Sequence, residues 1–399
     1  MAEVDGEDGG LAAAPGEGLV LAALRQAGAD QKPSDWDKRL GEVTPDEVRR
    51  TLANRPGFTP RRLLTLLSPA AATLLEDLSQ AAHRLTRQRF GNVITLFAPL
   101  YLSNYCRNLC RYCGFHAGNN DRRRRLSLEE AVAEARLLAR EGFRDILLVS
   151  GEDPAHVNPA FLGNLASILR QDNLFTSVGV EVNVLSEADY RLLLEHGIDG
   201  VTVFQETYAR DAYAHWHAGG PKAVYADRLN GQEAAAKAGM RRLGLGALLG
   251  LEDWRFDAYA MAVHAATLMR HYWRSRVSFS FPRLRPTESG GVEHFPHLVS
   301  DRELAQLIAA LRLSFPDAGM TLSTREAPGL RENLLPLGIT QVSAGSKTNP
   351  GGYSDGDTGQ GATGQFVVSD DRSPGEIVQV LRSLSYDPVW KDWDTGFQG

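Results

Sequence analysis

The chain has 399 residues, of which 43% are hydrophobic and 23% charged, and its formal net charge at pH 7 is −6. This balance is typical of a globular protein, and the negative net charge argues against nucleic acid as the main partner. No run approaches the ~20 apolar residues of a membrane span, so we expect no membrane partner and a cytoplasmic location.

Residues 1–33 are predicted to form a disordered acidic tail. The chain opens with "MAEVDGEDGGLAAAPGEG", a composition that buries little apolar surface and lacks the basic and apolar regions of a signal peptide. Residues 34–90 instead place leucines three and four positions apart, as in "TPRRLLTLLSP" and "AAATLLEDLSQAAHRLTRQRFG". This spacing predicts an N-terminal helical region.

Residues 91–345 alternate short apolar runs with longer helical patterns. Eight runs read as strands, at 92–98, 145–150, 177–184, 200–204, 242–249, 276–281, 319–323 and 339–343. Strands separated by helices predict parallel βα units, and eight such units close a (β/α)8 TIM-type barrel. A partial barrel and an open doubly wound sheet are the alternatives. Residues 346–399 are expected to form a glycine-rich loop and a C-terminal extension with a helix at about 373–385.

Polar residues follow several of these strands. In a βα barrel the catalytic groups lie at the carboxyl ends of the strands. The residues found there are Tyr101 and the cysteine loop, Gly151 and Glu152, Gln205 and Glu206, Arg283 and Arg285, Arg325, and Ser343. One rim of the barrel would therefore carry thiols, carboxylates and arginines, which predicts an active site. The basic run 122–125 is interpreted as a solvated helix entry.

The three cysteines of the chain all lie in one short loop, with the spacing Cys106-x3-Cys110-x2-Cys113. An odd number so closely spaced does not form a disulfide framework and indicates a reducing compartment. Three thiolates hold three irons of a [4Fe-4S] cluster and leave the fourth iron open to another ligand. The alternative metal site is a zinc site completed by His116. The corresponding alternative function is a non-catalytic zinc or iron–sulfur protein.

This loop, with Tyr112 before the last cysteine, resembles that of the radical S-adenosylmethionine (SAM) enzymes. Further segments resemble the 2-iminoacetate synthases, the tyrosine lyases of bacterial thiamine biosynthesis: "PLYLSNYC", "YCGF", "LLVSGE", "VFQETYARDAYAHWH", "GLGALLGLEDWR", "SFPRLRP", "LSTRE", "SKTNPGGY" and "PVWKDWD". The resemblance runs from about residue 35 to the end. It implies cleavage of L-tyrosine between Cα and Cβ to 2-iminoacetate and p-cresol, while SAM yields methionine and 5′-deoxyadenosine.

The resemblance also implies partners and excludes relatives. A flavodoxin or ferredoxin would supply electrons, and thiazole synthase would receive the imine. Two related enzymes need further cysteines for a second cluster: biotin synthase, and the tyrosine lyase that matures [FeFe]-hydrogenase. This chain has no cysteines to spare. A radical SAM lyase of another aromatic amino acid, such as the tryptophan lyase, remains the alternative because it shares the rim arginine and serine.

The resemblance assigns roles to matching positions. Cys106, Cys110 and Cys113 would bind the [4Fe-4S] cluster, and the open iron would take the amino and carboxylate groups of SAM. The residues expected to contact SAM are Tyr112, Gly151, Glu152, Gln205, Glu206, Gly246 and Arg283. The residues expected to hold the substrate are Tyr101, Arg325 and Ser343.

Several of the SAM assignments have structural alternatives. Glu152 would contact the SAM amino group, although the preceding Ser-Gly departs from the family's Gly-Gly, and a helix N-terminus is its alternative. Gln205 and Glu206 are expected at the ribose hydroxyls. Gly246 would admit the adenine, or mark a strand bulge. Arg283 would clamp the SAM carboxylate, or form a structural ion pair. For Tyr112 the alternative is core packing.

Overall fold

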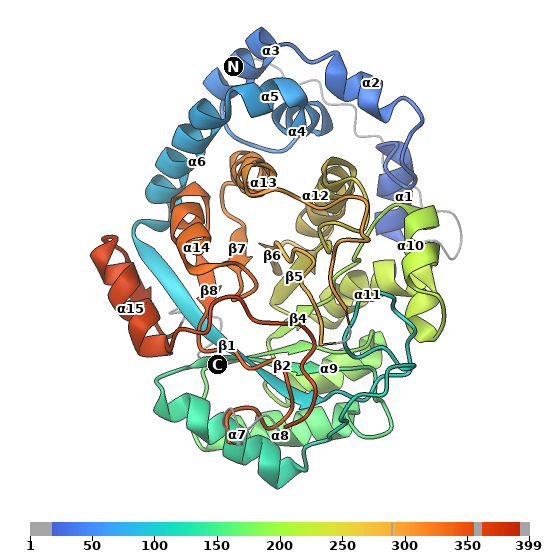
Figure 1. Ribbon diagram of the computed structural model, residues 1–399, viewed down its shortest axis with the longest axis vertical. Helices are drawn as coiled ribbons and strands as arrows, with labels where there is room; N and C mark the ends of the chain where they lie inside the picture. Colours follow the sequence, from blue (N-terminus) through green and yellow to red (C-terminus); the bar gives the residue numbers. More distant parts are fainter. Residues whose placement is uncertain (1–17, 289, 355–360, 392–399) are drawn as a thin grey trace.

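Eight parallel strands close into a barrel in the computed structural model, which describes residues 18–288, 290–354 and 361–391 (Figure 1). The strands are β1 (Val93–Ser103), β2 (Asp145–Ser150), β3 (Ser177–Glu181), β4 (Gly200–Thr202), β5 (Arg242–Gly246), β6 (Arg276–Ser280), β7 (Gly319–Leu322) and β8 (Gln341–Ser343). Each strand pairs with the next in chain order, and β1 pairs with both β2 and β8. The predicted (β/α)8 barrel is confirmed, although β3, β4 and β5 end earlier than expected.

Helices follow the strands and surround the barrel. They are α7 (Leu128–Arg140), α8 (Pro159–Gln171), α9 (Glu187–Glu195), α10 (Arg210–Trp216), η1 (Pro221–Ala223), α11 (Tyr225–Ala238), α12 (Trp254–His271), α13 (Asp301–Ser314), α14 (Pro328–Leu334) and η2 (Leu335–Leu337). Ser127 and Ser300 begin α7 and α13 as capping boxes. Gly239, with a φ of 97°, ends α11. Within the described residues, no helix is long and apolar enough to cross a membrane.

The strand β1 leads directly into the cysteine loop. Its register with β2 shifts between Tyr101 and Ser103, and such an irregularity bends a strand and redirects its side chains. Ser103 also forms an antiparallel bridge with Arg125. The two ends of the loop formed by residues 104–124 are therefore held side by side at the carboxyl end of β1.

Between residue 18 and the first barrel strand, the structure has six helices. They are α1 (Leu19–Gln26), α2 (Trp36–Gly41), α3 (Pro45–Ala53), α4 (Pro60–Leu67), α5 (Pro69–Thr73) and α6 (Leu75–Phe90). Helices α4 and α6 both pack on α13, so the N-terminal region covers one side of the barrel (Figure 1).

Helix α1 corrects the prediction of a disordered tail. It contacts α11 and α12, and its Val20 and Leu24 are fully buried. The buried residues of "LVLAALRQ" are Val20, Ala23 and Leu24, which share one helical face, a local signal that the acidic, glycine-rich flank obscured. Residues 1–17, the rest of the predicted tail, lie outside the described part of the chain.

Replacing Leu24 with alanine should therefore destabilise the protein. Loss of a fully buried leucine lowers the free energy of unfolding by about 2–5 kcal/mol, which denaturant titration of the cluster-free protein will measure. The control is Leu21→Ala in the same helix, because Leu21 is only partly buried and should cost less. Equal stability of Leu24→Ala and the wild type would show that α1 is not docked.

The C-terminal segment returns to the barrel. Helix α15 (Pro374–Ser383) starts at a Ser373 capping box, close to the expected helix. After it, β9 (Asp387–Val389) pairs with the start of β1, a ninth strand that the sequence did not reveal because "DPV" is short and contains a proline. Trp390 then packs edge-on against Phe143, so the extension is anchored to the barrel.

Candidate active site

A cavity of about 780 Å³ lies inside the barrel. Alternate residues of β1, from Val93 to Tyr101, line it, as expected for side chains that point inward from a strand. A smaller cavity of about 50 Å³ adjoins it and is lined by Cys113, Tyr112 and Glu206. Both cavities share Glu181, Phe204, Pro282, Arg325, Gln365 and Phe366. The space between the cysteine loop and the strand ends is therefore continuous with the barrel interior.

The three cysteines lie at this end of the barrel as free thiols. Asn108 Nδ2 donates to Cys106 Sγ at 3.6 Å, and the backbone N–H of Phe115 donates to Cys113 Sγ at 3.4 Å. Burial raises the pKa of the Cys110 thiol to about 12. A buried thiol such as Cys110 ionises more readily beside a bound cation, which a metal cluster would provide.

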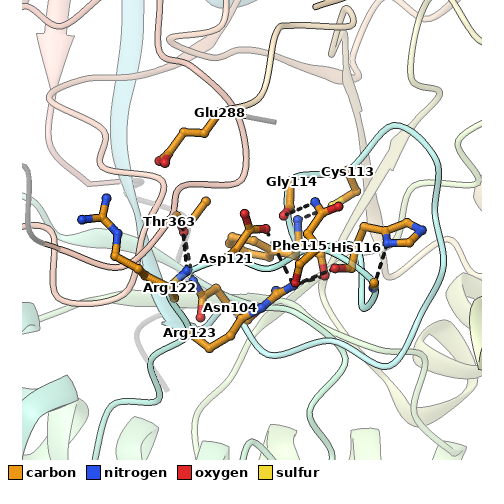
Figure 2. Close-up of polar contacts among 12 residues, drawn as sticks. Asn104, Cys113, Gly114, Phe115, His116, Asp121, Arg122, Arg123, Glu288 and Thr363 are labelled. Atoms are coloured by element: carbon orange, nitrogen blue, oxygen red, sulfur yellow. Dashed lines mark hydrogen bonds and ion pairs between the residues drawn. The ribbon is translucent and has the colours of Figure 1, made fainter. Parts of the chain in front are cut away.

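The fit of a cluster rests on this donor set. In the described part of the chain, no group of three His, Cys, Asp or Glu side chains is arranged so that it could hold a metal ion. His116, the fourth ligand of the zinc alternative, accepts the backbone N–H of Gly118 through Nδ1 at 2.8 Å (Figure 2). Three thiols in one loop, of which Cys113 lines the smaller cavity, with no fourth ligand brought to them among the described residues, suit a cluster that keeps one iron open.

The basic run 122–125 holds the cysteine loop, which corrects its interpretation as a solvated helix entry. Arg123 donates to the carbonyls of Asn104 at 2.5 Å, Phe115 at 3.2 Å and His116 at 2.6 Å (Figure 2). Arg125 pairs with Asp153 at 2.5 Å. One guanidinium thus joins the start of the loop to the turn after its last cysteine.

Gly151 and Glu152 pack against the same loop. The N–H of Gly151 donates to the Ser103 carbonyl at 2.9 Å, and a Cβ on Gly151 would lie 2.3 Å from the Tyr105 carbonyl oxygen. Only glycine fits there. Glu152 is nearly buried, with Oε2 at 4.0 Å from Arg107 Nε, and this oxygen has no hydrogen-bond partner among the described residues. Glu152 lines neither cavity, but this oxygen has no competing partner among the described residues.

We therefore expect Gly151→Ala to impair cluster assembly. The added methyl group must displace Tyr105 or the adjacent Cys106, at a cost of about 1–3 kcal/mol. Iron and sulfide analysis after anaerobic reconstitution should show a clear loss relative to the wild type. Gly329→Ala is the matched control, because nothing lies within 4 Å of its added Cβ. Equal iron content in both variants would contradict the expectation.

Gln205 and Glu206 follow β4, and only one of the two lines a cavity. Gln205 is buried and lines neither cavity, and its amide has no partner among the described residues. Glu206 has a φ of 69°, rare for a residue other than glycine, and lines the smaller cavity. Lys222 Nζ binds its carboxylate at 2.6 Å. Of the two residues expected at the ribose, only Glu206 faces a cavity.

Tyr112 makes the packing contacts expected as its alternative, whereas Gly246 lies in a regular part of β5 and forms no strand bulge. The Tyr112 hydroxyl lies 2.9 Å from His217 Nε2, and His217 Nδ1 lies 2.8 Å from the Tyr213 carbonyl. A carbonyl only accepts, so Nδ1 carries the proton and Nε2 accepts from Tyr112; burial lowers the pKa of His217 to about 3. Tyr112 nonetheless lines the smaller cavity. A Cβ on Gly246 would lie 2.6 Å from the Phe204 ring. The glycine therefore leaves room for the side chain of Phe204.

Arg283 forms the structural ion pair. Its guanidinium binds the buried carboxylate of Glu326 and lies 2.8 Å from Asp301. Arg285 binds Glu326 as well, at 2.5 Å. Arg283 lines neither cavity, so its geometry disfavours the expected clamp on the SAM carboxylate.

Tyr101, Arg325 and Ser343, the three residues expected at the substrate, all line the large cavity. The Tyr101 hydroxyl donates to Gln365 Oε1 at 2.8 Å, and Ser343 Oγ accepts the N–H of Thr324 at 3.1 Å. Arg325 lies over the Phe366 ring, 3.5 Å from its centroid. Its guanidinium forms no ion pair with a carboxylate among the described residues. The barrel thus presents to its cavity a partly buried cation that has no carboxylate partner among the described residues.

Glu181 is the cavity residue that the sequence reasoning missed. It is the last residue of β3 and lines both cavities. Burial, with a further contribution from Glu206, raises its pKa to about 7. The predicted strand continued to residue 184, so Glu181 was placed inside a strand and not at its end. A charged residue within the run "SVGVEVNV" was the available signal.

Comparisons with known proteins cover nearly the whole chain. Residues 100–260 match the radical SAM superfamily, and residues 280–387 match the Biotin and Thiamin Synthesis associated domain. The chain is 43% identical to the 2-iminoacetate synthases of Escherichia coli (strain K12) and Salmonella typhimurium, over 90% of this chain and 95% of each relative. The crystal structure of the FeFe-hydrogenase maturase HydG from Carboxydothermus hydrogenoformans is similar, with a TM-score of 0.80 at 31% identity, over 94% of this chain and 84% of that one.

Proposed function

The chain belongs to the 2-iminoacetate synthase family of radical SAM lyases, and from this premise we propose how its barrel cleaves tyrosine. The family reaction breaks the Cα–Cβ bond of L-tyrosine to give 2-iminoacetate and p-cresol. The observation that carries the proposal is the cavity that Tyr101, Arg325 and Ser343 share beside the cysteine loop. This shared cavity supports an amino-acid site next to the proposed radical source.

Cys106, Cys110 and Cys113 are proposed to bind a [4Fe-4S] cluster. A cluster held by these three thiolates would supply the electron for reductive cleavage of SAM. The chain's own residues shape the site: Asn108 donates to the sulfur of Cys106, and Arg123 fixes the loop backbone. Hydrogen bonds to cluster sulfurs adjust the reduction potential.

SAM is proposed to lie between the cysteine loop and the ends of β2 and β4. Glu152, with its unpartnered carboxylate oxygen, suits the SAM amino group. Glu206, held by Lys222, suits the ribose hydroxyls. Gly151 lets the loop approach, and Tyr112 borders the smaller cavity. Arg283, Gln205 and Gly246 are left out, because their contacts point to structural roles or away from the cavities.

Tyrosine is proposed to bind deeper in the cavity. Arg325 offers its carboxylate a planar, two-donor fork, and Ser343 and Tyr101 supply hydroxyl groups from neighbouring strands. A flavodoxin or ferredoxin is proposed as the electron donor. Thiazole synthase is proposed as the acceptor of 2-iminoacetate, because this imine hydrolyses in water.

The substrate is tested by an anaerobic assay of the reconstituted protein with SAM, a strong reductant and one amino acid at a time. We expect p-cresol and 5′-deoxyadenosine to accumulate together with tyrosine. Tryptophan and phenylalanine should give neither a cleaved side chain nor more 5′-deoxyadenosine than the blank. Turnover of tryptophan in place of tyrosine would assign the chain to the alternative lyase.

A further inference from the structure

Two partly buried side chains of opposite charge face the barrel cavity, and neither has a partner of opposite charge among the described residues. Glu181 at the end of β3 and Arg325 after β7 line both the large and the small cavity. Among the described residues, the side chain of Glu181 forms no hydrogen bond or ion pair, and that of Arg325 forms none with a carboxylate. They do not pair with each other, although each lies within the other's electrostatic influence.

Other charges near Glu181 are already engaged. Lys222 binds Glu206 at 2.6 Å, and Arg228 donates through Nε to the Phe204 carbonyl at 2.8 Å. Buried charges in proteins are normally paired because desolvation is costly. Burial raises the pKa of Glu181 to about 7, and a cation beside it would lower this pKa and keep the carboxylate ionised. The missing partner of Glu181 is thus a cation, and that of Arg325 is an anion.

A free amino acid carries both charges on adjacent atoms. We propose that Glu181 binds the α-ammonium group of the substrate while Arg325 binds its carboxylate, so that the two side chains form one site for an amino-acid zwitterion. This assignment rests on the proposed function, because it takes tyrosine as the occupant. It gives the substrate amine a fixed position, and the amine is where hydrogen abstraction begins in this family.

The test separates the two charges with three ligands. Tyrosine carries both groups, tyramine keeps the ammonium without the carboxylate, and 3-(4-hydroxyphenyl)propanoate keeps the carboxylate without the ammonium. Their dissociation constants are measured by calorimetry on the reconstituted protein with SAM and an oxidised cluster, where no turnover occurs. The variants are Glu181→Gln and, as the matched control, Asp317→Asn, an exposed acid at the other end of the same cavity.

Glu181→Gln should weaken tyrosine and tyramine binding on the order of tenfold to a hundredfold, the range for losing a charge-assisted hydrogen bond. Binding of 3-(4-hydroxyphenyl)propanoate should be unchanged or tighter, which also shows that the variant is folded. Asp317→Asn should match the wild type with all three ligands.

Three results would overturn the assignment. Equal weakening of all three ligands would mean that Glu181 only shapes the cavity, and no weakening of any would mean that it touches no ligand. A loss of SAM affinity without amino acid would place Glu181 at SAM. These differ from a failure of the proposed function, in which the wild-type protein itself binds no tyrosine and the assignment falls with it.

Discussion

Alanine at Cys106, Cys110 or Cys113 will abolish both the assembled [4Fe-4S] cluster and the cleavage of SAM. The loop holds three thiols, of which Cys113 lines the smaller cavity, and no fourth cysteine exists in the chain. With two thiolates left, two irons lack a protein ligand. The measurements are iron and sulfide content after anaerobic reconstitution, and 5′-deoxyadenosine formed with reductant. The loss of SAM cleavage should reach the detection limit.

His116→Ala is the control for the cysteine variants. If a zinc site completed by His116 were correct, this variant would lose its metal. The cluster proposal instead predicts normal iron content, because the His116 ring accepts the N–H of Gly118 and sits on a turn fixed by Arg123. A cysteine variant that kept wild-type turnover, or a colourless wild-type protein stably loaded with zinc, would contradict the cluster.

Arg325→Lys should uncouple the two products and not simply weaken binding. The guanidinium has no competing carboxylate among the described residues and lies on the Phe366 ring. Lysine keeps the charge but loses the planar fork that orients a carboxylate. A displacement of about 1 Å from the reactive geometry can lower a rate on the order of a hundredfold. SAM cleavage should continue while p-cresol falls, so the ratio of 5′-deoxyadenosine to p-cresol should rise.

The matched control for Arg325→Lys is Arg285→Lys. Arg285 comes from the same rim, but it binds Glu326 at 2.5 Å, so it should change the product ratio little. If Arg325→Lys kept the wild-type ratio at saturating tyrosine, Arg325 would not hold the carboxylate. If both variants uncoupled equally, the effect would come from the rim as a whole.

The fold was largely predictable because hydrophobic patterns are local. The eight apolar runs all became strands, since each is short, apolar and bounded by helical patterns. The predictions that failed concern segments whose structure depends on tertiary contacts. Helix α1 depends on the faces of α11 and α12, and β9 exists only because the start of β1 offers it an edge.

The types of residue in the site could be predicted from the sequence. Which charged side chains pair with each other was harder to predict. Tyr101, Arg325 and Ser343 were found from their positions after strands, and they share a cavity. Which arginine was free could not be read from the sequence, because Glu326 is adjacent to Arg325 but binds Arg283 and Arg285 instead. Glu181 was hidden by an overlong strand, since an end misplaced by three residues moves a rim side chain into the predicted strand interior.

The most direct test of the central claim follows the Cα atom of tyrosine. Tyrosine labelled with ¹³C at Cα is incubated anaerobically with the reconstituted protein, SAM and reductant, and the products are observed by NMR. The account predicts label in 2-iminoacetate or its hydrolysis product glyoxylate, in an amount equal to the p-cresol formed. Label that stays attached to the aromatic side chain while 5′-deoxyadenosine accumulates would contradict cleavage of the Cα–Cβ bond.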